Sequence, residues 1–189
     1  LVDALSRGGL APPNHWSNAW TELLYALALI GADRVDEAHT HLSRALVVDG
    51  RYDHPLTCVV FLAQGRLARE ARNAPLASRL LAEASFSAFY HDNWNVLDEA
   101  LRLGQQNHLM VRAPGVYPPL GAAAEWARRR GLRLLTANFR IAQAENLAAL
   151  GETDAAGAAL DQATRWLGDM DAGRPGIRHR YLGAMVGFQ

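Results

Sequence analysis

The sequence contains no lysine, and all 19 of its Lys+Arg residues are arginine. A P-loop lysine, a Schiff-base lysine and a lysine general base are therefore excluded within this chain. Cysteine is nearly absent as well, because Cys58 stands alone and cannot form an internal disulfide. A lone cysteine fits a reducing compartment, so we expect a cytoplasmic protein.

Long apolar stretches and net charge are also missing. No apolar run reaches the roughly 18 residues of a membrane-spanning helix, and the N-terminus does not resemble a signal peptide. The formal net charge is zero, which removes the electrostatic case for a nucleic-acid-binding protein. Hydrophobic residues make up 50% of the 189 residues, as in a globular protein. Because the sequence begins with Leu1, we expect it to be part of a longer chain.

One pattern of small residues occurs three times. An alanine is followed by a leucine four residues later and by a second alanine three residues after that. The three copies are Ala38, Leu42 and Ala45; Ala77, Leu81 and Ala84; and Ala156, Leu160 and Ala163. This spacing places the three side chains of a copy on one face of a helix. Small residues at fixed places predict close helix–helix contact, because larger side chains would hold the two backbones apart.

Each copy has a further small residue upstream, on a predicted partner helix. For the three copies these residues are Ala26, Gly65 and Ala144, and Gly104 occupies the same place in a repeat that lacks the full pattern. The four small residues are 39, 39 and 40 residues apart. A period near 40 with two helices per repeat indicates an α-solenoid. We predict one domain, 1–189, with repeats at about 16–52, 54–91, 92–131 and 133–170 and a C-terminal helix at 174–187. The prolines and glycine within 112–119 predict a longer loop in the third repeat.

This arrangement resembles the tetratricopeptide-repeat family, which has small residues at positions 8, 20 and 27 of each repeat. The first, second and fourth repeats match at all three positions, whereas the third matches only at Gly104, with Ala123 and Ala127 as displaced candidates. The period is near 39 instead of 34, which is similar to the repeat arms of large bacterial ATP-dependent transcription regulators. The resemblance implies an all-α fold, a right-handed superhelical stack of about four antiparallel helix hairpins.

In tetratricopeptide-like arrays the first helix of each repeat lines a concave groove. The corresponding positions give the candidate ligand- or peptide-binding residues Arg66, Arg69, Glu70, Arg102, Gln105, His108, Asn138 and Glu145. Guanidinium groups bind carboxylates through paired, charge-assisted hydrogen bonds, so this groove suits an acidic partner. The alternative is that the arginines pair with Glu70, Asp98 and Glu145 on a solvated surface.

The first repeat has a different surface, because its groove positions Trp20, Leu23, Leu24 and Leu27 are apolar. An exposed patch of this kind is usually covered. We expect residues 1–14, preceding repeats or a second copy of the chain to cover it, so self-association through this repeat is one prediction.

No catalytic or metal-binding set stands out in the sequence. His54 and Cys58 are one helical turn apart, as a base and a nucleophile are, but Cys58 is expected to be a small buried hydrophobe. Glu37 and His41 lack a third metal ligand. We therefore predict no catalysis, no metal and no cofactor.

The predicted function is that of a scaffold that binds a protein or peptide with its concave face, with no nucleic acid or membrane as partner. The alternative is a small-ligand-sensing arm of a bacterial ATP-dependent transcription regulator. A third class, an enzyme that uses the 112–119 loop, is less favoured by the sequence.

Overall fold

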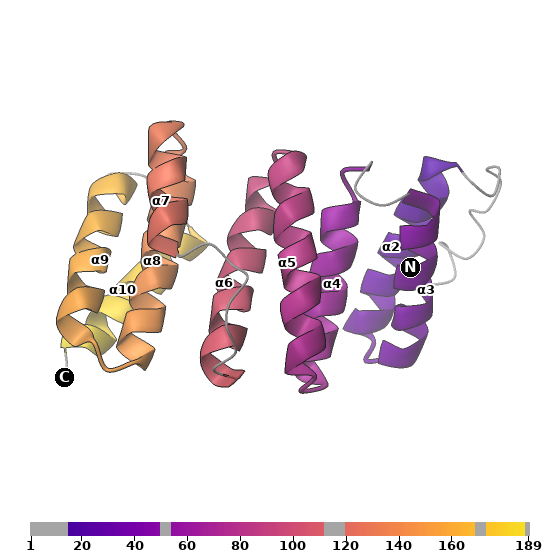
Figure 1. Cartoon of the computed structure of the whole chain (residues 1–189), viewed down its shortest axis with the longest axis horizontal. Coiled ribbons are helices and arrows are strands. Elements are labelled where there is room, and N and C mark those ends of the chain that lie inside the picture. The colour runs from indigo at the N-terminus through magenta and orange to yellow at the C-terminus, as the bar shows by residue number, and fades with distance from the viewer. Residues whose placement is uncertain (1–14, 50–53, 112–119, 169–172, 188–189) are drawn as a thin grey trace. The chain divides into compact units, whose positions relative to one another are not determined.

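The computed structural model describes residues 15–49, 54–111, 120–168 and 173–187. Within these ranges all the regular structure is helical, so the predicted all-α class is confirmed (Figure 1). The helices are α2 (Trp16–Gly31), α3 (Val35–Asp49), α4 (Thr57–Glu70), α5 (Ala74–Tyr90), α6 (Trp94–Val111), α7 (Leu120–Arg129), α8 (Arg133–Ala149), α9 (Thr153–Leu167) and α10 (Arg174–Gly187). The predicted loop at 112–119 lies outside the described residues.

The chain divides into two compact units, an N-terminal unit (Leu1–Ala100) and a C-terminal unit (Leu101–Gln189). The boundary falls within α6. The single domain, the number of hairpins and the superhelical stack remain predictions.

Five of the turns between consecutive helices share one backbone geometry. Three residues separate the helices in each case, and the middle residue has a φ between 55° and 80°. The N–H of the next residue bonds to the carbonyl five positions earlier, as Arg34 does to Leu29 and Leu132 to Ala127. This is the Schellman arrangement, which satisfies carbonyls that a helix end leaves free. The residues with this left-handed backbone conformation are Asp33, Arg72, Asp92, Gly131 and Gly151.

In the N-terminal unit, α2 packs against α3 and α4 against α5, and α3 packs against α4. All six residues of the first two copies of the small-residue pattern have 0% exposure. Gly65 shows how close α4 and α5 come, because a Cβ at this position would lie 2.9 Å from the Leu81 side chain. The predicted burial of Ala38 and Ala77 is therefore confirmed.

In the C-terminal unit, α8 packs against α7 and α9, and α10 contacts both α8 and α9 (Figure 1). Ala156 and Ala163 are fully buried and Leu160 nearly so, which confirms the predicted burial of Ala156. One apolar cluster joins Ala144 of α8 to Leu182 of α10. The helix predicted at 174–187 is thus present, and it rests on the α8–α9 pair.

Candidate functional site

The first three candidate residues belong to α4. Arg66 is exposed, and its Nη2 lies 2.5 Å from the Oε2 of Glu99 on α6. Arg66 therefore has a carboxylate partner, as the surface-pairing alternative proposed, but the partner is Glu99 and not Glu70 or Asp98.

Arg69 and Glu70 end the same helix. Arg69 is half-buried in the last turn, where the helix dipole favours a cation, and Glu70 is exposed. Within the described part of the chain Arg69 forms no ion pair, so its guanidinium has donors available for a ligand.

The remaining candidates lie in the C-terminal unit. Arg102 and Gln105 on α6 and Asn138 on α8 are half-buried, and each has an interaction within the protein. The side chain of His108 lies outside the described residues. Arg66 and Arg102 belong to different units, so the arginine cluster that the sequence suggests remains a prediction.

Glu145 is paired inside the protein. Its carboxylate accepts three hydrogen bonds of 2.8–3.0 Å from Nε and Nη2 of Arg178 on α10. The two side chains are only 25% and 21% exposed. The sequence does not indicate this partner, because the two residues are 33 positions apart and no local pattern links them.

A second group of arginines ends α7. Glu125 accepts hydrogen bonds from Arg128 and Arg129. These bonds, chiefly those from Arg128, lower the pKa of Glu125 to about 2. Arg130 lies over the ring of Trp126 at 5.0 Å, a cation–π distance. Arg128 and Arg129 therefore share one carboxylate on their own helix, which offsets only one of their two positive charges.

His41 and Cys58 have structural partners. His41 Nδ1 lies 2.5 Å from Glu22 Oε2 and its ring meets Tyr25 edge-on, whereas Glu37 pairs with Arg34. Cys58 is buried, as predicted, and its Sγ donates to the Pro55 carbonyl at 3.1 Å. Burial raises the pKa of the Cys58 thiol. No group of three potential metal ligands comes together among the residues that the structure describes.

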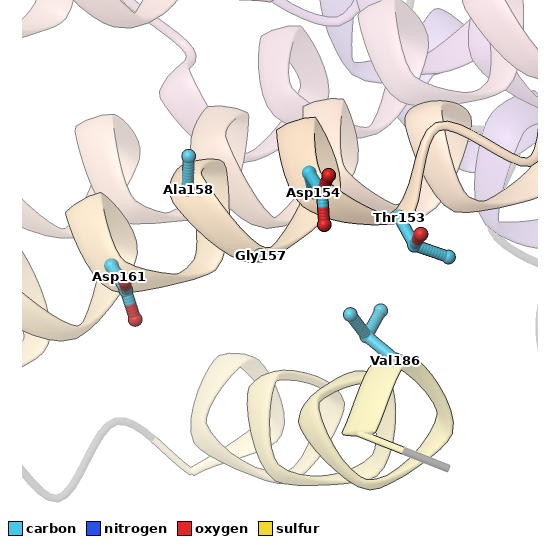
Figure 2. A pocket seen from close by; sticks show the side chains of 6 residues that line it. All are labelled: Thr153, Asp154, Gly157, Ala158, Asp161 and Val186. Carbon is cyan, nitrogen blue, oxygen red and sulfur yellow. The ribbon is translucent and has the colours of Figure 1, made fainter. Parts of the chain in front are cut away.

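An open groove of about 580 Å³ lies between α9 and α10. Figure 2 shows Asp154 and Asp161 on α9, with Val186 directed from α10 toward α9. Thr153, Gly157 and Ala158 complete the lining. The groove combines small residues with two exposed carboxylates, and it was not predicted from the sequence.

No family model matches the chain, and no curated protein or solved structure matches it significantly. In the described ranges, no helix combines the length and the apolar character needed to cross a membrane.

Proposed function

We propose that the chain is a tetratricopeptide-like helical repeat domain whose function is to bind a protein or peptide partner, without catalysis. The observation that carries this proposal is the burial of the same alanine–leucine–alanine pattern in α3, α5 and α9. Each copy packs against the preceding helix of its pair. Repeated pairs of this kind serve to present an extended surface for recognition.

We place the binding surface on the exposed side of α4, at Arg66 and Arg69. Arg66 is 46% exposed at its side chain although it contacts Glu99, so part of its guanidinium faces solvent. Arg69, one turn further along, has no ion-pair partner in the described ranges. Two guanidiniums on one helix face favour an acidic segment, because each can bind a carboxylate by charge-assisted hydrogen bonds.

We call the surface formed by Arg66 and Arg69 the arginine surface of α4. A labelled oligoglutamate peptide tests it, with an oligolysine peptide as the control. We expect binding of the acidic peptide to weaken roughly tenfold with Arg66→Ala and again with Arg69→Ala, since each change removes a charged donor. Binding should also decline as salt rises. Fluorescence anisotropy measures both effects.

The matched control is Arg79→Ala, which removes an exposed arginine from α5 instead of α4. It should leave binding unchanged. The thermal midpoint should change little in all three variants, because the exposed Arg66–Glu99 pair contributes about 0–1 kcal/mol and the other two substitutions break no ion pair in the described ranges. If Arg66→Ala unfolds the protein while binding per folded molecule persists, Arg66 is structural and the surface lies elsewhere.

A further inference from the structure

Helix α10 is held on the α8–α9 pair by one polar and one apolar anchor. The polar anchor is the Arg178–Glu145 pair, in which both carboxylate oxygens are engaged. The apolar anchor is Leu182, which is 6% exposed and packs against Ala144, Ala156, Ala159 and Leu160. His179 adds a contact of 2.8 Å between its Nε2 and Thr164 Oγ1.

The surface beneath α10 has the features of a helix-binding groove. We define the α10-docking face as Ala144, Glu145, Ala156, Ala159, Leu160 and Thr164, the residues that contact α10 through these anchors. Its alanines allow a helix to approach closely, and Glu145 fixes the helix by accepting a forked pair of donors. Grooves of this kind bind an amphipathic helix through anchor residues that are one turn apart, as Arg178 and Leu182 are.

Helix α10 itself is only lightly bound. Among its described side chains only Leu182 is buried, whereas α9 buries Ala156, Ala159, Leu160, Ala163 and Leu167. Gly183 lies inside α10, although no atom comes within 4 Å of the position of an added Cβ. Close packing therefore does not require a glycine at this position. The glycine does lower the intrinsic helix propensity of α10. The open groove beside Val186 leaves a further part of the interface unfilled.

We propose that the α10-docking face binds an amphipathic helix of a partner protein, one with an arginine four residues before a leucine. In the free chain α10 occupies this face as an internal competitor, and the partner helix displaces it. The basic character of the partner follows from Glu145, which would otherwise lose its guanidinium partner in a half-buried position. This site does not depend on the arginine surface of α4, so either proposal can fail without the other.

A labelled peptide with the sequence of residues 174–187 serves as the probe, added to the full chain. With the wild-type chain binding should be weak, because only the fraction of molecules with α10 released can accept the peptide. Leu182→Asp in the chain removes the apolar anchor and should tighten apparent binding by about tenfold or more. Gly183→Ala stabilises α10 as a helix and should weaken binding relative to wild type.

Two controls make the result specific to this face. Adding Glu145→Ala to the Leu182→Asp chain should reverse most of the gain. A peptide with Arg178→Leu and Leu182→Arg, which exchanges the two anchors at constant composition, should bind at least tenfold more weakly. Arg178→Ala provides a second way to release α10 without burying a charge, and it should act in the same direction as Leu182→Asp.

Three results would overturn the proposal. Equal binding of the exchanged peptide would show a nonspecific apolar patch. Absence of binding to every released variant would show that the face accepts no helix in trans. Loss of helix well beyond α10 in both Leu182→Asp and Arg178→Ala, measured by circular dichroism, would show that α10 is an integral part of the C-terminal unit.

Discussion

At the residue scale, Asn93 shows how one residue can join three elements through its side chain and its backbone. Its Oδ1 accepts a hydrogen bond of 3.3 Å from the N–H of Val96, which caps the start of α6. Its Nδ2 donates to Cys58 Sγ at 3.5 Å, which ties the same turn to α4. The backbone N–H of Asn93 also bonds to the Ala88 carbonyl at the end of α5. The contact with Cys58 joins residues 35 positions apart in the sequence, so no local pattern indicates it.

Asn93→Ala should lower the free energy of unfolding by about 1 kcal/mol, because it removes the cap. Asn93→Asp keeps an acceptor at the helix start and adds a favourable charge there, so it should retain most of the stability. Urea denaturation compares the two variants. An equal loss in both would mean that the contact with Cys58, and not the cap, provides the stabilisation.

At the element scale, the burial of each second helix follows from its own sequence, whereas the partners of charged residues do not. The alanine–leucine–alanine spacing predicts the buried face because a helix repeats every 3.6 residues. The partner of Arg66 could not be predicted in the same way. Asp98 and Glu99 are adjacent, and one position along a helix turns a side chain by about 100°. An error of that size in the expected rotation of α6, which is a shift of one residue, exchanges one acidic partner for the other.

The glycines at positions 65 and 157 test the helix contacts, because the same substitution should have opposite effects. Gly65→Ala places a Cβ 2.9 Å from Leu81, so Leu81 must move and the protein should lose about 1–3 kcal/mol. Gly157→Ala meets no atom within 4 Å in α9 and should gain up to about 1 kcal/mol from helix propensity. Thermal or urea denaturation gives both values. A stable Gly65→Ala variant would show that α4 and α5 can separate without cost.

At the scale of the whole molecule, several large apolar side chains remain exposed to solvent although the core is well packed. On α2, Leu23 is buried as a core residue, but Trp20 is 44% exposed and Leu27 is 38% exposed. The sequence predicted that this face is covered, and the formal net charge of zero provides no general repulsion between copies. Two exposed apolar side chains on one helix face suit a symmetric contact, in which the same patch serves both partners.

We therefore predict that the chain self-associates through α2, and that Trp20→Ser combined with Leu27→Ser shifts it toward the monomer. The physical reason is the loss of apolar area that dimerisation would remove from water, at roughly 25 cal/mol per Å². Leu150→Ser is the matched control, because Leu150 is 58% exposed but lies in the turn between α8 and α9. Sedimentation equilibrium over a range of concentrations measures the monomer fraction of each protein. A wild-type chain that is monomeric throughout that range would contradict the prediction, and so would a control variant that dissociates as readily as the α2 variant.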